Sequence, residues 1–427
     1  MLITSIFLIS ITLKEAIERV LEKNLSLESL EYTVKAAEDL AKSSISYLLP
    51  RANINFNYSR QFKLPEIEIL PGQKREVGRK EQSQLVLSLV QAFPIDFSVW
   101  YARQAVISAY RSQKWSYENT KNEVLFTTAN LYISISNLTN ARELAQENYD
   151  RVKKRYETAQ RLFESGIISR TDLLRIETSV YEAELQIRNL DLQIHNTLAI
   201  FSSLLLINEE NILPVQKIED LIETLKPEEA IEKSKTEIKS EALKTPDILS
   251  LENTVEQLDN QAKFERGKLF PQLSLGFSLL NTYGTFIEQR NIPSLSVGIS
   301  LNIDFGGSLF SYLSAEKRKI SAMYQLEDAK LRKQKDLENI FKEYEITKEK
   351  IKVAQKRLEF AQRSLESAQE FFERGRITSV DLLDYELQFE NAKIDVLNSK
   401  SELLLLFLKL KKIQGKIYEV FSQQKDA

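Results

Sequence analysis

Cysteine is absent from the 427-residue sequence, and histidine occurs once, as His195. Without cysteine there is no disulfide framework, thiolate metal site, cysteine nucleophile or lipid-modified N-terminal cysteine. A single histidine argues against a multi-histidine metal centre and a histidine-rich pH switch. Lys and Arg number 58 and Asp and Glu 61, so the formal charge of −3 excludes a strongly basic nucleic-acid-binding protein and an acidic disordered chain.

Glycine and proline are also scarce, with 11 and 9 residues, well below the roughly 7% and 5% of average proteins. The stretches that contain neither residue are long, and they span 95–165, 167–213, 308–374 and 376–414. Because these two residues commonly end helices, the pattern predicts a long helix, a turn at Gly166 or Gly375 and a shorter helix, occurring twice. A helix of about 65–70 residues would be ~100 Å long, which no compact globule needs.

The long stretches carry the seven-residue periodicity that is typical of coiled coils. Large residues recur at Leu337, Tyr344, Ile351, Leu358, Leu365 and Phe372, and the row three positions later holds Ile340, Thr347, Ala354, Ala361 and Ala368. Large residues on one row and mostly small ones on the next predict a seam at which helices approach closely. This is a packing signal and points to no chemistry.

The two halves of the sequence are similar to each other. Residues 159–166 match residues 368–375, and the same spacing carries Asp172 onto Asp381. Ile95-Asp96-Phe97 likewise corresponds to Ile303-Asp304-Phe305. We therefore expect a first structural repeat over 12–213, a linker over 214–229 and a second structural repeat over 230–427. Each repeat is expected to have the order helix, two strands, long helix, Gly turn, helix.

The N-terminal residues have a different character. Residues 2–11 are mostly apolar, with the length of a signal-peptide core, and are too few to span a bilayer as a helix. No Lys or Arg precedes them and no A-x-A cleavage pattern follows. We expect residues 1–11 to be a signal-peptide remnant, with a buried N-terminal segment as the alternative.

Four segments alternate apolar and polar residues as strands do, over 52–59, 83–91, 272–279 and 294–305. Such segments form either a transmembrane β-barrel, with one face toward lipid and one toward a wet lumen, or the half-buried sheet of a soluble protein. We favour the barrel because the polar faces hold Asn, Ser, Gln and Gly with a single Asp. Four strands cannot close a barrel in lipid, so the chain would oligomerise, and three copies would supply twelve strands.

In their order and duplication, these features resemble the TolC family of outer-membrane efflux proteins over nearly the whole chain. The resemblance is carried by Thr12-Leu13-Lys14-Glu15-Ala16-Ile17, Leu49-Pro50, Ile303-Asp304-Phe305-Gly306 and the paired Gly-x5-Asp-Leu-Leu turns at Gly166/Asp172 and Gly375/Asp381. It implies a mainly α fold with β-strands: a long coiled-coil α-helical barrel, and four strands per chain in the 12-stranded transmembrane β-barrel of a homotrimer. It also implies docking to a periplasmic adaptor (membrane fusion) protein and an inner-membrane efflux pump or ABC transporter.

The second Gly turn holds the strongest candidate site. Asp381 and Asp384 are three positions apart, so on a helix they share one face, and a three-fold assembly would turn each into a ring of carboxylates that attracts cations. The resemblance implies the same, because two aspartates line the closed periplasmic entrance in the TolC family and match these positions. The alternative is that Asp in a first helical turn serves only as a cap, which accounts better for Asp381 than for Asp384.

Asp172, in the first turn, resembles the aspartate that helps to hold neighbouring coils closed in this family. The family partners of that aspartate are a Tyr and an Arg, whereas Phe372 and Ile377 occupy the corresponding positions here. A helix cap is the alternative role for Asp172, and Arg374 or Arg376 is a possible replacement partner. The resemblance also implies that the turns around Gly166, Gly375, Arg374 and Arg376 contact the adaptor.

The sequence thus predicts an outer-membrane exit duct with a large periplasmic portion, gated at its periplasmic helical tip. It would passively conduct solutes for a tripartite efflux or type I secretion system, surrounded by outer-membrane lipid. A Gly-rich phosphate loop, a G-x-S-x-G motif and a ligand cluster with metal spacing are all missing, so we expect no enzyme activity, cofactor or metal, and no nucleic-acid partner. The alternative is a soluble coiled-coil structural or adaptor protein of the periplasm.

Overall fold

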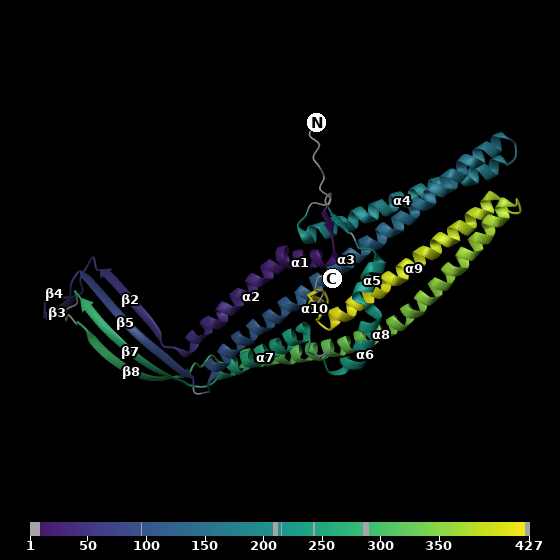
Figure 1. Cartoon of the computed structure of the whole chain (residues 1–427). Helices are drawn as coiled ribbons and strands as arrows, with labels where there is room; N and C mark the ends of the chain where they lie inside the picture. The colour runs from purple at the N-terminus through teal and green to yellow at the C-terminus, as the bar shows by residue number, and fades with distance from the viewer. Residues whose placement is uncertain are drawn as a thin grey trace. The chain divides into compact units, whose positions relative to one another are not determined.

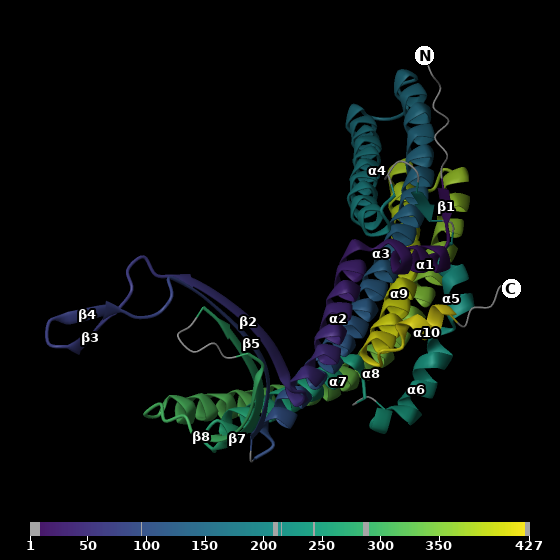
Figure 2. The same ribbon diagram turned by 90° about the vertical axis from the view of Figure 1, so that its left-hand side faces the viewer.

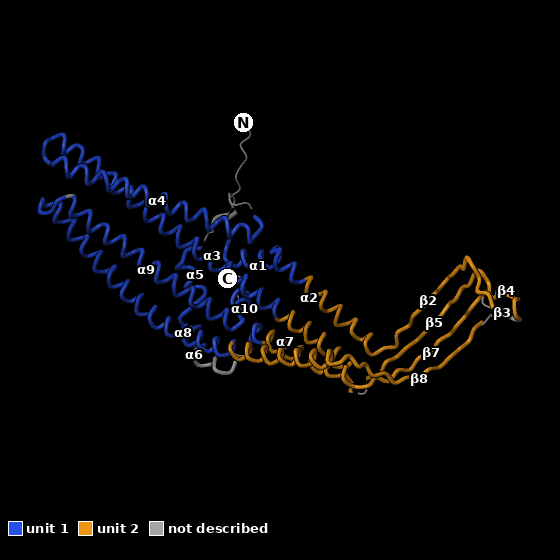
Figure 3. The backbone as a smooth tube through the Cα atoms, turned by 180° about the vertical axis from the view of Figure 1, so that it is seen from behind, with its two compact units in different colours: residues 1–31, 116–248, 329–427 blue, residues 32–115, 249–328 orange. Residues whose placement is uncertain are grey.

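The computed structural model describes residues 9–94, 96–207, 212–214, 216–241, 244–284 and 290–422 (Figure 1). The chain forms two compact units. Unit 1 comprises residues 1–31, 116–248 and 329–427, and unit 2 comprises residues 32–115 and 249–328 (Figure 3). Each unit therefore takes segments from both halves of the sequence.

Two helical hairpins dominate unit 1. Helix α3 (Ser98–Glu164) turns back into α4 (Arg170–Leu205), and α8 (Gly307–Glu373) turns back into α9 (Ser379–Ile413). Both α3 and α8 have 67 residues and contribute to both units. In both hairpins the chain turns at the predicted glycine, Gly166 or Gly375, so the two-hairpin prediction is confirmed, although α4 ends at Leu205, before the end of its stretch without glycine or proline.

The coiled-coil seam of α8 is confirmed as well. The row of mostly small residues is buried, and it comprises Ile340, Thr347, Ala354, Ala361 and Ala368. Of the large row, Leu337 and Tyr344 are buried, while Ile351, Leu358 and Leu365 are half-buried. Small side chains at the closest points let neighbouring helices approach along the seam.

The main core of unit 1 gathers around Tyr132 of α3. The Tyr132 hydroxyl donates to the Ile11 carbonyl oxygen at 3.0 Å and accepts from the Gln216 amide at 3.3 Å. Its ring meets that of Phe201 edge-on, with centroids 6.2 Å apart. Strands β1 (Ile9–Ile11) and β6 (Ile212–Pro214) pair in parallel beside it. One buried side chain thus joins segments that are far apart in the sequence.

Shorter helices are divided between the two units. Helix α1 (Leu13–Lys23) begins with a capping box between Thr12 and Glu15, and it buries Ala16 and Ile17. Capping and burial thus account for the residues of the motif at positions 12–17. The chain continues into α2 (Leu25–Ser43) and a 3₁₀ helix, η1 (Ser44–Leu48). Helices α6 (Pro227–Glu241), α7 (Pro246–Gly267) and α10 (Ile417–Ser422) follow later in the chain.

Two segments that were predicted to lie outside the structural repeats contribute buried residues to the core. The expected linker, 214–229, contains helix α5 (Ile218–Leu225), which buries Ile218, Leu221 and Leu225. Its apolar residues recur at helical spacing, so the segment packs as an amphipathic helix. Of the expected signal-peptide remnant, Ile9–Ile11 forms β1 and Ile11 is buried, while residues 1–8 lie outside the described residues.

Unit 2 contains a four-stranded antiparallel sheet in the order β2-β5-β7-β8 (Figure 1; turned by 90° in Figure 2). The strands are β2 (Arg51–Arg60), β5 (Glu81–Pro94), β7 (Gln272–Tyr283) and β8 (Ile292–Ser300). A separate hairpin of β3 (Glu66–Leu70) and β4 (Gln73–Glu76), which the sequence analysis missed, lies in the connection between β2 and β5. All four strands predicted from alternation are present.

The pairing register places apolar side chains on one face of this sheet and small polar side chains on the other. One face is mainly apolar, and it includes Ile54, Phe56, Leu85, Leu87, Leu89, Leu275, Phe277, Leu295, Val297 and Ile299. The opposite face is mainly small and polar, and it includes Asn53, Asn55, Asn57, Gln84, Ser88, Ser274, Gly276, Ser278, Ser294 and Ser296. Many of the apolar side chains are exposed, among them Leu295 and Ile299.

The fourth strand ends earlier than predicted, at Ser300 and not at Phe305. The physical reason is a corner before α8. Phe305 has φ 49° and Gly306 φ 110°, and the Asp304 carboxylate accepts from the Ser308 amide at 2.7 Å. The matching corner before α3 has Phe97 at φ 59°, with Asp96 accepting from the Ser98 amide at 3.1 Å. The repeated Asp-Phe motif therefore ends a strand and caps a helix.

The helices among the described residues differ from membrane-spanning helices in their composition. None of them combines the length and the apolar character that a membrane-spanning helix needs.

Candidate functional site

The two helical turns share one backbone design. After α3, the Ile167 amide donates to the Leu162 carbonyl oxygen at 2.9 Å and the Gly166 amide to that of Phe163 at 2.9 Å. This 6→1 and 5→2 pair is a Schellman motif. After α8, the Arg376 amide donates to Phe371 at 2.8 Å and the Gly375 amide to Phe372 at 2.9 Å.

Both motifs place glycine in the left-handed region, where a side chain costs energy. Gly166 has φ 75° and Gly375 φ 68°. A Cβ added to either glycine would have no heavy atom within 4 Å. The requirement for glycine is thus conformational and not steric.

A hydroxyl residue caps the helix that follows each turn. The Ser169 hydroxyl accepts from the Asp172 amide at 3.1 Å and donates to the Asp172 carboxylate at 2.7 Å. Thr378 makes the same two bonds with Asp381, at 3.2 and 2.7 Å. The Thr378 amide also donates to the Asp381 carboxylate at 2.8 Å, which completes a capping box. The Asp381 carboxylate therefore takes part in the helix cap through a backbone amide, whereas the Asp172 carboxylate supports its cap through the Ser169 hydroxyl.

Beyond these caps, the two turns differ in charge. Asp384 lies one turn after Asp381 on α9 and is exposed, whereas Arg175 holds the corresponding position after Asp172. The hydroxyl and amide of Thr378, together with the nearby Arg175 guanidinium, lower the pKa of Asp381 below its ordinary value of 3.8. The carboxylate of Asp381 thus stays ionised under ordinary conditions.

The other residues predicted around the second turn are exposed. Arg374 forms an ion pair with Glu370 at 3.7 Å, and Arg376 closes the Schellman motif through its amide. Phe372 is partly exposed and Ile377 half-buried. Neither apolar side chain offers a hydrogen bond to Asp172, whose carboxylate binds Ser169.

The structure brings the two hairpins together close to their turns. A small cluster contains Ala159 of α3, Ile176 of α4 and Val380 of α9. Ile176 is fully buried, and Tyr156 and Leu173 pack against the cluster. Asp172, Asp381 and Asp384 therefore lie on helices that contact one another at this end of unit 1.

A second contact between the hairpins is ionic, and the sequence analysis missed it. Arg155 of α3 donates to Glu386 of α9 at 2.6 Å, and Arg151 donates to Glu390 at 2.5 Å. Lys393 approaches Glu147 at 4.0 Å as a third rung. We call these three pairs the ion-pair ladder. Because the helices are antiparallel, residues four apart on α3 meet residues three or four apart on α9.

Burial makes the ladder energetically important. The side chains of Glu386 and Glu390 are each 7% exposed, and that of Arg155 is 13% exposed. Among the described residues, a second oxygen of each glutamate and one nitrogen of Arg155 are buried without a hydrogen-bond partner. Removal of Arg155 would leave the buried Glu386 without its partner, and such a loss typically costs about 3–5 kcal/mol. In the sequence, Arg151 and Arg155 are four positions apart, as are Glu386 and Glu390. This spacing alone does not predict their pairing, because the pairing depends on how α3 and α9 align.

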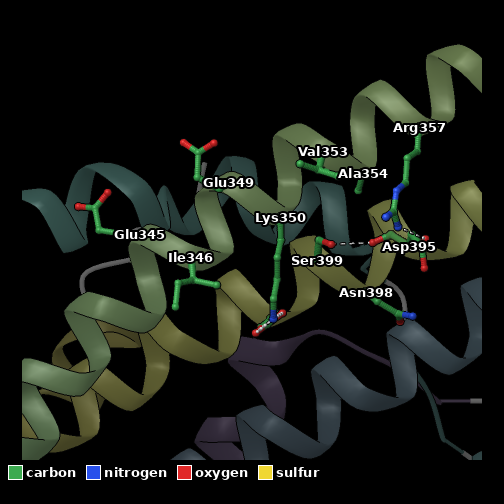
Figure 4. A pocket seen from close by; sticks show the side chains of 11 residues that line it. Glu345, Ile346, Glu349, Lys350, Val353, Ala354, Arg357, Asp395, Asn398 and Ser399 are labelled. Atoms are coloured by element: carbon green, nitrogen blue, oxygen red, sulfur yellow. Dashed lines mark hydrogen bonds and ion pairs between the residues drawn. The ribbon is translucent and has the colours of Figure 1, made fainter.

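A groove of about 680 Å³ runs between α8 and α9 (Figure 4). Ion pairs join Lys350 to Glu402 at 2.8 Å and Arg357 to Asp395 at 3.8 Å. Ile346 and Val353 line the groove, and Phe360 extends the same row seven residues on. All three side chains are at least half exposed, so the described chain leaves an apolar row on α8 uncovered.

Within the described ranges, no group of three or more His, Asp or Glu side chains is arranged to hold a metal ion.

Comparison with solved structures shows the same fold in bacterial outer-membrane proteins. The CmeC outer membrane channel of Campylobacter jejuni has a TM-score of 0.80 at 18% identity, covering 95% of this chain and 85% of that one. VceC of Vibrio cholerae scores 0.80 at 15% identity, with coverages of 94% and 96%. The open state of the MtrE channel of Neisseria gonorrhoeae scores 0.76 at 17% identity, with coverages of 97% and 93%.

Sequence comparison identifies the family. No curated protein sequence matches this chain. The family model described as outer membrane efflux protein matches residues 16–205 and 238–416, which is most of the sequence. The chain therefore belongs to the outer membrane efflux protein family, which confirms the resemblance and the outer-membrane location predicted from the sequence.

Proposed function

We propose that three copies of this chain form a passive exit duct of a tripartite efflux or type I secretion system, gated at the periplasmic helical tip. The observation that carries the proposal is the separation of the sheet into an exposed apolar face and a small polar face. An apolar outer face suits lipid, and small polar residues suit a wet lumen. The alternative function, a soluble coiled-coil structural or adaptor protein of the periplasm, does not explain why so much apolar surface of the sheet is exposed. The outer-membrane location of the family also argues against this alternative.

Two open edges of the sheet support closure by further copies. Strands β2 and β8 each pair on one side only within the four-stranded sheet. In hydrocarbon, unpaired backbone groups cost several kcal/mol each, so the edges require partners. Three sheets of four strands would give a twelve-stranded barrel wide enough for a lumen.

Exposed apolar rows on two helices support the same assembly. Helix α8 presents Ile346, Val353 and Phe360, and α4 presents Tyr181, Leu185 and Leu192. Tyr181 and Phe360 are 63% and 70% exposed, and both lie 15 positions from the glycine of their own turn. The two side chains are therefore at the same level, and we propose that α4 of one copy packs against α8 of the next.

Cysteine cross-linking tests this assembly directly, since the natural chain has no cysteine. In outer membranes, Tyr181→Cys with Phe360→Cys is expected to give disulfide-linked trimers on non-reducing gels. Gln362, exposed on the opposite side of α8, supplies the control: Tyr181→Cys with Gln362→Cys should remain monomeric on the gel. Equal cross-linking of the two pairs, or none in either, would contradict the proposed packing.

In this proposal, the carboxylates of Asp381 and Asp384 form the periplasmic gate of the duct. With three copies, Asp381 and Asp384 would form two rings of carboxylates, and rings of this kind favour cations. The exposure of both residues and the lowered pKa of Asp381 support the idea. Asp172 would take part through its helix cap, close to the same tip.

Partners would engage the exposed turns. Gly166 and Gly375 form tight turns with Arg374 and Arg376 beside them, and we propose that a periplasmic adaptor docks there. Energy would come from an inner-membrane pump or ABC transporter, because the proposed duct performs no catalytic step.

A further inference from the structure

One end of the four-stranded sheet is distinguished by the course of the chain. At one end, β5 leads to α3 and β8 leads to α8 within a few residues. At the other end lie the hairpin of β3 and β4 and the connection from β7 to β8. If the sheet crosses the outer membrane as proposed, with the helices in the periplasm, this second end lies at the outer surface. The inference below rests on that proposed function.

A cavity of about 390 Å³ lies at this outer end. Its lining includes Tyr58 of β2, Ser83 of β5 and Tyr283 of β7. Ser83 pairs with Tyr58 on one side and with Tyr283 on the other, so the three residues form one row across the sheet. The row continues the face of Phe56 and Leu85, which is the apolar face.

The two tyrosines therefore stand where the apolar face ends. Both rings are more than half exposed. Tyrosine is favoured at this depth of a membrane because its ring suits the acyl boundary and its hydroxyl suits the headgroups. The cavity thus opens at the level of lipid headgroups.

Basic residues surround the same cavity. Arg79 and Lys80 line it, and the Arg290 guanidinium lies 5.7 Å from the centroid of the Tyr283 ring. Glu81 is the acidic residue of the lining, and it pairs with Arg60 at 3.7 Å. Among the described residues around the cavity, basic side chains therefore outnumber acidic ones, which suits an anionic group.

We propose that this cavity binds the phosphate-bearing headgroup of a lipid of the outer leaflet. Arg79 and Lys80 would hold the phosphate through charge-assisted hydrogen bonds. Tyr58 and Tyr283 would lie beside the sugar or glycerol portion, with the acyl chains along the apolar face below. Bound lipid would then fix the depth of the sheet in the membrane.

The test measures binding of bisphosphorylated lipid A to the detergent-purified trimer by native mass spectrometry. Arg79→Gln with Lys80→Gln is expected to weaken binding about tenfold or more, since each basic residue near an anionic surface contributes ~1 kcal/mol. Lys74→Gln with Arg75→Gln on β4 removes the same charge from the same connection and is expected to leave binding unchanged. Arg79→Lys with Lys80→Arg keeps both charges and should retain binding, which separates loss of charge from misfolding.

Three results would overturn the proposal: equal binding by the Arg79/Lys80 and Lys74/Arg75 variants, failure of the charge-keeping variant to bind, or full displacement of the lipid by millimolar inorganic phosphate. The last result would assign the cavity to free phosphate and not to a lipid headgroup. Single-channel conductance is recorded on the same preparations. Conductance without selective lipid binding would reject this site alone, whereas absence of conductance in every preparation would reject the proposed duct.

Discussion

The turn after α3 and the turn after α8 have the same backbone but present different charges. Both close with a Schellman motif, and both are followed by a hydroxyl residue that caps the next helix through an aspartate three positions on. One turn later along the helix, the first has Arg175 and the second has Asp384. The second turn thus presents two carboxylates, whereas the first presents one carboxylate and the Arg175 guanidinium, which lies near Asp381.

Helix capping explains some of the aspartates at these two turns but not all of them. Capping accounts for both Asp172 and Asp381, because each carboxylate accepts from the hydroxyl of its cap residue, and it accounts best for Asp381, which also accepts from the Thr378 amide. It does not explain Asp384, which lies beyond the cap. The property specific to the second turn is therefore its pair of carboxylates, and that property is what a cation-attracting ring requires.

The largest expected effect comes from uncoupling the two hairpins. Arg155→Met removes one member of the ion-pair ladder and leaves Glu386 charged and buried, so we expect the free energy of unfolding to fall by about 3 kcal/mol. Arg142, which pairs with the exposed Asp191 of α4, is the matched control, and Arg142→Met should cost less than ~1 kcal/mol. Urea unfolding of the detergent-purified protein, followed by circular dichroism at 222 nm, measures both.

A double variant sharpens this test. Arg155→Met combined with Glu386→Leu removes both charges of the rung, so most of the lost stability should return. Stability that stays as low as in Arg155→Met would mean that packing, and not the unpaired charge, dominates at this rung.

A moderate and equal effect is expected from the turn glycines. Gly166→Ala and Gly375→Ala each place a side chain in the left-handed region, which costs about 1–2 kcal/mol, while neither added Cβ meets another atom. The same urea titration should give the same loss for both. A much larger loss at only one turn would contradict the shared backbone design.

The smallest effect concerns the pH at which Asp381 loses its charge. Thr378→Val removes the main interaction that lowers the pKa of Asp381, so that pKa should rise toward 3.8. Since a lowered pKa keeps the carboxylate charged to lower pH, cation selectivity in Thr378→Val should disappear at a higher pH than in the natural protein. Ser169→Ala removes the equivalent cap of the first turn and should leave this pH unchanged in bilayer recordings.

The regular elements were predictable because each has a strong local signal. Long stretches without glycine or proline gave α3, α4, α8 and α9, and strict alternation gave the four strands of the sheet. Helix α5 was missed because its signal spans only two turns beside Pro214 and Pro227. The last predicted strand was too long because its alternation continues into the corner where Phe305 and Gly306 turn the chain.

Site residues were predictable only where the residues that act together are close in the sequence. Asp381 and Asp384 are recognisable from spacing on one helix, as are the turn glycines. The pairing of Arg155 with Glu386 joins residues more than 200 positions apart, so it depends on how two hairpins align. The proposed lipid cavity depends in the same way on the register that sets Tyr58 and Tyr283 on either side of Ser83.

The most direct test of the account compares the ion selectivity of the two turns in planar bilayers. Single-channel reversal potentials are measured under a salt gradient for the natural protein, for Asp381→Asn with Asp384→Asn, and for Asp172→Asn. The account predicts a cation-selective channel whose selectivity is largely lost in the double variant and kept in Asp172→Asn. Unchanged selectivity in the double variant, or equal losses in both, would contradict an acidic gate formed by the second turn.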